Sequence, residues 1–394
     1  MSDLTALYNP KALLDLGGVD QLDKVRAEPN PFWNRARLEI AWALPVMSGL
    51  VDRESISLQP MRLATRDELR LYHDPSYIET LELFGNMGYA FSSRFGLDTD
   101  DCPVFPDVDK YASYPVGATV DAVMSVAGGR FHNAISFFGG FHHAMANLAA
   151  GFCYYNDCVI ALKKYRQMYP NKKVLYLDTD AHHADGTQKA FYSDPSVLKI
   201  STHEYSMGFF PGTGTAEEIG EGEGRGYSVN IPLPPLTDDA QFWKAFEEVV
   251  VPLWEAYKPD FVFWEVGGDA HVNDPLTDLM LTFETYQRLS RTVRQLVHAS
   301  GSGLVVVGGG GYDPVATAKI WTLVLADMAG IPLPPGLPTE WIKLCRRHYR
   351  EVDRQAWTDP PVRTDPEHRR SVQREVAETI STIKKLIFPF FGLE

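Results

Sequence analysis

Acidic and histidine residues in the middle of the sequence have the types and spacing that metal-assisted hydrolysis needs. Asp180 and His182 lie two residues apart within Asp178–Gly186, so they point the same way if the chain there is extended. A carboxylate and an imidazole are two of the three protein ligands of a catalytic zinc site. Asp269, which follows a separate apolar run, is the expected third ligand. An isolated Asp-x-His triplet could be a solvated turn, but the tandem histidine and the nearby carboxylates argue against that interpretation.

Two adjacent histidines, His142 and His143, follow an apolar run and a Gly-Gly turn. A single histidine is more often structural than catalytic, but an adjacent pair after a strand is harder to explain that way. Asp178 and Asp185 are available to accept a hydrogen bond from one ring nitrogen of each histidine. Such pairing fixes the tautomer and tunes the basicity of the imidazole. We therefore predict general acid–base catalysis by this pair.

Four consecutive glycines precede Tyr312. A phosphate cradle is one explanation, but the run lacks the following Lys-Ser/Thr and the G-x-G-x-x-G spacing. The glycines instead let the backbone approach a narrow cavity closely and present the tyrosine at its edge. A phenol in that place donates a hydrogen bond to a developing oxyanion.

These clusters must be positioned by a regular scaffold, and the sequence predicts one. The expected strands are short, largely apolar runs: Ala134–Phe138, Lys173–Asp178, Val197–Thr202, Phe261–Val266 and Gly303–Val307. The expected helices include Asp238–Tyr257, capped by Thr237, as well as Phe283–Ala299 and Glu367–Leu386. Alternating strands and helices predict a mostly parallel sheet covered on both faces. The chemical clusters follow directly after strands, where open α/β sheets bind ligands.

Composition excludes several classes of function. The chain has 394 residues, of which 45% are hydrophobic, and a net charge of −14. That charge and the lack of a basic patch argue against direct nucleic-acid binding and favour a cationic substrate. The four cysteines form no C-x-x-C pair, and we find neither a signal peptide nor a membrane-length apolar run. We expect a cytoplasmic protein with reduced thiols and no membrane partner.

The order of the motifs resembles the histone deacetylase family. The matching motifs are Gly140–His143, Gly151–Tyr154, Asp178–Gly186, Phe210–Gly214, Gly268-Asp269 and Gly308–Tyr312. The segments Gly268–His271, Asp274–Thr277 and Ile331–Pro334 look most like the bacterial acetoin-utilisation (AcuC-like) branch. The similarity covers roughly residues 5 to 345, and the motifs together are highly specific.

The resemblance implies a single α/β domain of the arginase-deacetylase type, with a mostly parallel central sheet between helical layers. We place this zinc-dependent deacetylase domain at residues 1–345 and a C-terminal helical tail at 346–394. The tail should pack on its own domain, and a subunit contact in a homo-oligomer is the alternative. The resemblance also implies zinc at Asp180, His182 and Asp269. Ferrous iron would suit the same ligands.

Further site residues are implied by the resemblance alone. Asp101 matches a rim aspartate that holds the substrate backbone, and Leu276 lies at the tunnel mouth. The other expected substrate-binding residues line the tunnel and the cavity beyond the metal: Gly151, Phe152, Phe210, Arg37, Phe141 and Cys153. Structural K⁺ or Na⁺ is expected at two sites, the first formed by Asp178, Asp180, His182, Ser201 and Thr202 and the second by Phe191, Asp194, Val197 and Tyr227. For the aromatic residues and Cys153, the alternative is an ordinary place in the core.

The sequence departs from the family pattern at three places. Ala184 replaces a usual glycine, Asn30-Pro31 replaces a usual His-Pro, and Gly17–Glu28 is longer than the usual entry loop. The catalytic set is intact. The sequence therefore predicts a zinc-dependent hydrolase of Nε-acyl-lysine, with acetyl as the expected acyl group.

Three other functions are alternatives to lysine deacetylation. One is deacetylation of a small acetylated amine such as a polyamine, and another is a catalytically silent acyl-lysine binding module. The intact catalytic set argues against the silent module. The third is hydrolysis of a guanidinium compound on two metals, which would need more acidic ligands than the single Asp/His/Asp set.

Overall fold

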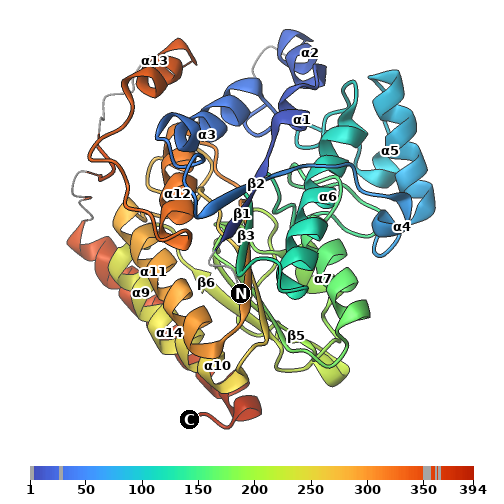
Figure 1. Cartoon of the computed structure of the whole chain (residues 1–394). Coiled ribbons are helices and arrows are strands. Elements are labelled where there is room, and N and C mark those ends of the chain that lie inside the picture. Colours follow the sequence, from blue (N-terminus) through green and yellow to red (C-terminus); the bar gives the residue numbers. More distant parts are fainter. Residues whose placement is uncertain (1–3, 26–29, 349–355, 360–361, 363–364) are drawn as a thin grey trace.

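The chain folds around an eight-stranded sheet in which all neighbouring strands pair in parallel (Figure 1). The computed structural model describes residues 4–25, 30–348, 356–359, 362 and 365–394. The strand order is β2-β1-β3-β8-β7-β4-β5-β6. The strands are β1 (Thr5–Asn9), β2 (Ile56–Pro60), β3 (Asn133–Ser136), β4 (Val174–Asp178), β5 (Val197–Glu204), β6 (Ser228–Leu233), β7 (Phe261–Glu265) and β8 (Gly303–Val307).

Helices cover both faces of this sheet, with α6 and α7 on one side and α11 and α12 on the other (Figure 1). The α-helices are α1 (Lys11–Leu14), α2 (Gly18–Val25), α3 (Arg35–Met47), α4 (Arg66–Leu69), α5 (Pro75–Met87), α6 (Val108–Ala127), α7 (Asp157–Met168), α8 (Asp185–Ala190), α9 (Asp239–Ala245), α10 (Val251–Tyr257), α11 (Phe283–Ser300), α12 (Pro314–Met328), α13 (Thr339–His348) and α14 (Pro366–Ile387). A π-helical turn, η3 (Phe246–Val250), joins α9 to α10, and short 3₁₀ turns are η1 (Ser93–Phe95), η2 (Gly222–Gly224) and η4 (Phe388–Phe391).

The five predicted strands are present, and the single α/β domain with a parallel sheet is confirmed. Strands β4, β5 and β7 are buried at every residue. β4 and β7 therefore appear in the sequence as nearly continuous apolar runs, whereas β5 is interrupted by Lys199 and by the polar residues 201–204. Strands β1, β2 and β6 were not predicted. β2 lies at the edge of the sheet and includes a proline, and β6 carries Asn230 and Pro232, so neither gives a clean apolar signal.

The register of the sheet aligns the ends of the strands that carry the chemical clusters. Asp178, the last residue of β4, lies beside Ser201 of β5 and Glu265 of β7. Glu265 in turn lies beside Val307, the last residue of β8. The segments that follow β3, β4, β7 and β8 therefore leave the sheet at one edge.

One predicted helix start is wrong. We expected Thr237 to cap the helix at Asp238, but the helix begins at Asp239 with Asp238 as its N-cap. The Asp238 carboxylate accepts a hydrogen bond from Gln241 N, whereas the Thr237 hydroxyl donates to Pro234 O at 2.6 Å. The threonine hydroxyl closes the preceding turn, and the Asp238 carboxylate bonds to the first turn of the helix instead.

The C-terminal helix α14 lies along β6 and α9. Its apolar stripe, which includes Val376, Ile380 and Ile383, is buried. Arg369 reinforces the contact through an ion pair with Asp238, at 3.0 Å between nitrogen and oxygen. Within the described parts of the chain, no helix combines the length and apolarity that crossing a bilayer requires.

Candidate active site

The three predicted metal ligands meet at the carboxyl ends of β4 and β7. His182 Nδ1 lies 3.2 Å from Asp180 Oδ1 and 3.0 Å from Asp269 Oδ2. All three side chains are buried, and their ligand atoms lie within 4.8 Å of one another. Burial and the adjacent Asp180 raise the pKa of Asp269 to about 6. Two carboxylates and an imidazole turned toward one another in a buried place fit a divalent cation.

Backbone groups hold the two carboxylates in this arrangement. Gly310 N donates to Asp180 Oδ2 at 2.6 Å, and Ala181 N donates to Asp269 Oδ1 at 2.9 Å. The remaining oxygen of each carboxylate faces His182. Gly310 must be glycine here, since a Cβ atom at this position would lie 2.1 Å from Asp269 Oδ2. This contact explains part of the four-glycine run.

The tandem histidines pair with the predicted aspartates. His142 Nδ1 lies 2.9 Å from Asp178 Oδ2, and His143 Nδ1 lies 2.7 Å from Asp185 Oδ1. Both Nδ1 atoms therefore act as donors, which leaves the two Nε2 atoms, 3.0 Å apart, for proton exchange. Burial lowers the pKa of His143 to about 4. The His143 ring is thus uncharged at neutral pH and keeps a lone pair that can accept a proton.

Tyr312 lies beside the metal-ligand cluster. Its ring meets His182 edge-on, with 6.0 Å between the ring centroids. Tyr312 N donates to Asp274 Oδ2 at 2.7 Å, and Arg37 Nε donates to Gly311 O at 2.8 Å. The loop that presents the phenol is therefore held by a carboxylate on one side and a guanidinium on the other.

Aromatic rings and a glycine surround the approach to these residues. The Phe210 ring meets His143 edge-on, with 4.8 Å between centroids, and the Phe152 ring lies 5.6 Å from that of Tyr312. A Cβ atom at Gly151 would lie 2.5 Å from His143 Cδ2 and 2.8 Å from Phe210 Cε1. Gly151 thus leaves the space beside His143 open. Phe209 was not predicted as a site residue, and its ring stacks on that of His182 with 5.1 Å between the centroids.

The residues expected beyond the metal lie together, with one exception. Arg37 and Phe141 line a small cavity of about 10 Å³, together with Phe32, Trp33 and Gly309. The Trp33 and Phe141 rings stack at 5.7 Å, and Arg37 lies 4.0 Å above the Phe32 ring. Cys153 is buried but is not among the residues around this cavity, and its thiol donates to Gly151 O.

The sequence departures are accommodated without strain. Ala184 precedes α8 with φ of −73° and ψ of 58°, the angles of an inverse γ-turn, which do not require glycine. Asn30 Oδ1 accepts hydrogen bonds from Phe32 N and Trp33 N, so Asn30 organises the entry to α3, which carries Arg37. Within the long segment Gly17–Glu28, residues Gly18–Val25 form α2, and residues 26–28 lie outside the described ones.

The predicted rim residues are at the surface. Asp101 is exposed, beside the exposed acidic residues Asp98 and Asp100. Leu276 is 42% exposed and lies in the loop that follows Asp269. Asp274 in the same loop accepts a hydrogen bond from Leu276 N at 3.0 Å as well as the one from Tyr312 N. The rim is therefore connected to the loop that carries the phenol.

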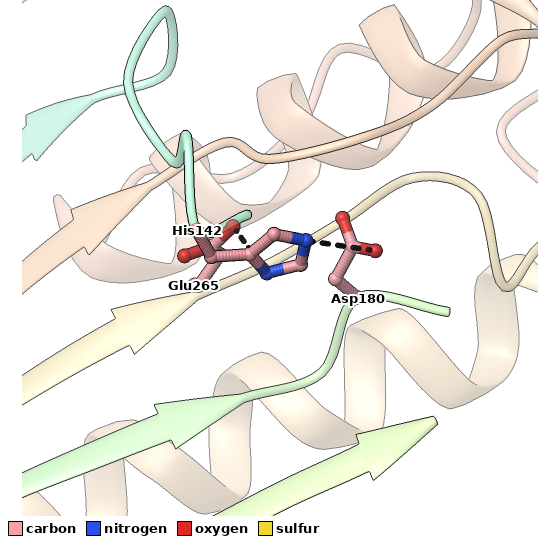
Figure 2. Close-up of side chains that lie close together, drawn as sticks. All are labelled: His142, Asp180 and Glu265. Carbon is pink, nitrogen blue, oxygen red and sulfur yellow. Dashed lines mark ion pairs between the residues drawn. The ribbon is translucent and has the colours of Figure 1, made fainter. Parts of the chain in front are cut away.

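Glu265 is an acidic residue of the site that the sequence analysis missed. Figure 2 shows His142 lying between Glu265 and Asp180. Glu265 Oε1 lies 3.1 Å from His142 Nδ1, and Tyr176 donates its hydroxyl toward both Glu265 and Asp178. Burial beside Asp178 raises the pKa of Glu265 well above its ordinary value. The signal that could have found it is a carboxylate at the end of an otherwise apolar strand.

His142, Asp180 and Glu265 form a second His/carboxylate group that resembles a metal site. Both nitrogens of His142 are already engaged, Nδ1 by Asp178 and Nε2 by His143. No ring nitrogen is left for a second cation. This arrangement argues for one catalytic metal rather than two.

The two predicted sites for monovalent ions differ. In the first, Asp178 and Ser201 lie side by side on neighbouring strands, and Thr202 Oγ1 donates to Asp178 O at 3.4 Å. This oxygen-rich setting suits K⁺ or Na⁺, and the ion there stays a prediction. In the second, an amino group already bonds to one of the predicted ligands, because Lys199 Nζ lies 2.6 Å from the carbonyl oxygen of Phe191.

Comparison with known proteins shows one family throughout. Residues 32–328 match the histone deacetylase domain. The chain is 37% identical to the acetoin utilization protein AcuC of Bacillus subtilis (strain 168), over 81% of this chain and 84% of that protein. It is 34% identical to AcuC of Staphylococcus aureus (strain MSSA476), over 86% of this chain and 88% of that one.

Solved structures agree with the sequence relatives. The fold matches a crystal structure of an HDAC homologue complexed with SAHA, with a TM-score of 0.82 and 30% identity over 97% of this chain and 99% of that one. It also matches an HDAC homologue from Aquifex aeolicus, with a TM-score of 0.80 and 28% identity, over the same shares of the two chains.

Proposed function

Because this chain belongs to the histone deacetylase family and is a deacetylase of its AcuC-like branch, we propose that it hydrolyses the amide of Nε-acetyl-lysine in proteins or peptides. The products are acetate and the free lysine amine. The observation that carries this proposal is the Asp180/His182/Asp269 cluster beside the paired histidines and Tyr312, at the end of an aromatic-lined approach. The four cysteines are free and buried, which supports the cytoplasmic location we expect.

Asp180, His182 and Asp269 would hold the metal, for which we propose Zn²⁺ with Fe²⁺ as the alternative. When bound, the metal supplies Lewis-acid polarisation of the amide carbonyl and lowers the pKa of a water. Gly310 N and Ala181 N fix the orientation of the two carboxylates in advance. The protein therefore does not have to reorganise these ligands during the reaction.

The histidine pair would move the protons. His143 Nε2 accepts a proton from the attacking water and then delivers it to the nitrogen of the leaving lysine. Asp185 holds the Nδ1 proton of His143, so Nε2 remains the reactive nitrogen. His142, bonded to Asp178, lies 3.0 Å away and stabilises the proton on its neighbour's Nε2.

Tyr312 would stabilise the oxyanion that forms on the acetyl oxygen. Burial raises the pKa of its phenol well above the ordinary value, so the group keeps its proton and can donate it in a hydrogen bond. A donor that strengthens its bond only as negative charge develops accelerates the chemical step. Asp274 and Arg37 hold the backbone on either side of this tyrosine.

The residues at the rim favour a peptide substrate over a small amine. Leu276 offers an apolar contact where an acidic residue would attract the distal ammonium of a polyamine. Asp101 is exposed and can accept hydrogen bonds from peptide N–H groups. The exposed carboxylates of Asp98 and Asp100 favour the second candidate, an acetylpolyamine, because they would attract a cationic tail.

The test is the ratio of kcat/KM for an acetyl-lysine peptide to that for acetylspermidine, measured as acetate release by the metal-loaded enzyme. We expect the unmodified enzyme to favour the peptide. Leu276→Glu should move the ratio toward the polyamine by about three- to tenfold, because a carboxylate adds a charge-assisted contact. Asp101→Ala should reduce kcat/KM for the peptide more than for the polyamine.

The matched control is Leu58→Glu, which places the same charge at a leucine of similar exposure, 41%, on the edge strand β2. It should leave the ratio unchanged. A tenfold or greater preference of the unmodified enzyme for acetylspermidine would show that the substrate is a small amine.

A further inference from the structure

Lys199 is a buried lysine in the middle of strand β5, and only 4% of its surface is exposed. An amino group is rarely removed from water unless a partner inside the protein accepts its hydrogen bonds. Lys199 Nζ donates to Phe191 O at 2.6 Å. This oxygen belongs to the group of residues in which the family resemblance predicts the second monovalent ion.

Several oxygen atoms of that group already accept hydrogen bonds. Phe191 O accepts from Lys199 Nζ and also from Asp194 N at 3.1 Å, and a carbonyl oxygen has two lone pairs. Tyr227 O accepts from Lys199 N at 2.9 Å. Asp194 Oδ1 accepts from both Ser196 N and Ser196 Oγ. Phe191 O therefore has no lone pair left for a metal ion, and the set with Lys199 in place does not fit one.

The amino group also occupies the space that an ion would need. An ion bonded to Phe191 O would have to enter the position held by Lys199 Nζ, and an ammonium there would repel it. Burial lowers the pKa of Lys199 to about 7, and the carboxylate of Asp194 opposes that shift. Whether protonated or neutral, the nitrogen fills the position and donates to the carbonyl.

We propose that the amino group of Lys199 replaces the second monovalent ion, so that only the first of the two predicted K⁺ or Na⁺ sites remains among the residues that the structure describes. The consequence is local. Phe191 ends helix α8, and the same helix begins at Asp185, which pairs with His143. The lysine therefore fixes the far end of the helix that carries Asp185, and does so independently of the ion concentration.

Thallous ion is a direct probe, since it takes the place of K⁺ and scatters X-rays anomalously. Crystals of the unmodified protein soaked in Tl⁺ should show no anomalous peak bonded to Phe191 O. Crystals of Lys199→Met, which removes the amine but keeps an unbranched apolar stem, should gain a peak bonded to Phe191 O and Tyr227 O. A Tl⁺ ion at Phe191 O in the unmodified protein overturns the proposal, and so does a variant that binds none there.

Thermal unfolding gives a second readout that does not depend on activity. Compared with choline chloride at the same ionic strength, KCl should raise the Tm of Lys199→Met by about 2 °C more than that of the unmodified protein. Lys163→Met is the matched control, because Lys163 Nζ lies 5.3 Å from the Phe191 ring without a hydrogen bond to its carbonyl oxygen. Equal responses to K⁺ in all three proteins would overturn the proposal.

Discussion

At the scale of single residues, the site is held by groups that do not themselves react. Gly310 N, Ala181 N and Asp274 each orient a residue that would contact metal or substrate. Donors and acceptors fixed in advance lower the barrier without reorganisation during the reaction. We therefore expect substitutions of Gly310 or Asp274 to reduce turnover even though they leave the reacting side chains in place.

Tyr312→Phe tests the role of the phenol. Loss of a single oxyanion donor should lower kcat and kcat/KM together by roughly 10²–10³, because the bond strengthens in the transition state. Steady-state kinetics on the acetyl-lysine peptide measures both constants. An unchanged kcat with a raised KM would show that the hydroxyl serves only ground-state binding.

Glu265→Gln tests the state of the buried carboxyl beside His142. Burial and the adjacent Asp178 raise the pKa of Glu265 well above its ordinary value, which favours the neutral form of the side chain. The amide has the same shape and no charge, so kcat should stay within about threefold. Glu265→Ala is the comparison, and its kcat should be lower because it removes one of the two carboxyl partners of the Tyr176 hydroxyl. A hundredfold loss in the glutamine variant would mean that an ionised carboxylate is required.

Residue types and spacing were enough to predict the side chains that the structure brings together at the metal cluster and the histidine pair. Asp180, His182 and the histidines stand in short motifs after apolar runs, so their chemistry is visible locally. Glu265 and Phe209 could not be found that way, because their importance comes from contacts across strands and loops. Lys199 was missed for the same reason.

At the scale of helices and strands, the central strands were predictable and the edges were not. Strands β4 and β7 are buried on both faces and leave an almost uninterrupted apolar signal, and β5 begins with a mostly apolar stretch. An edge strand such as β2 alternates between exposed and partly buried residues, and its sequence resembles a loop. The start of α9 was predicted one residue early because Thr237 and Asp238 are both residue types that cap helices, and only Asp238 bonds to the first turn.

The helix α14 provides a test at this scale. Its residue Ile383 is fully buried, on the stripe that packs against the body of the protein. Ile383→Ala should lower the free energy of unfolding by about 2–4 kcal/mol, since it leaves a cavity, without changing kcat. Chemical denaturation measures the change, and exposed Gln373→Ala should shift it by no more than about 0.5 kcal/mol. A buried-site variant as stable as the control would mean that the tail is not part of the folded domain.

At the scale of the whole molecule, one edge of a parallel sheet gathers the segments that follow β3, β4, β7 and β8. The tandem histidines follow β3, and the first two metal ligands follow β4. The third ligand follows β7, and the tyrosine follows β8. The sequence predicted this convergence because ligands bind at the carboxyl ends of strands in such sheets. The contribution of the C-terminal tail could not be predicted, since its packing partner β6 gives no clear strand signal.

The proposed mechanism depends most on a single metal held by Asp180, His182 and Asp269. The most direct test is the metal content of the purified protein, measured by elemental analysis after loading with Zn²⁺ and removal of the excess. The unmodified protein and Glu265→Gln should each hold one equivalent at the catalytic cluster. Asp269→Ala should remain folded, as judged by circular dichroism, and should hold much less than one equivalent of Zn²⁺. Full occupancy in Asp269→Ala would contradict the assignment of this cluster as the metal site.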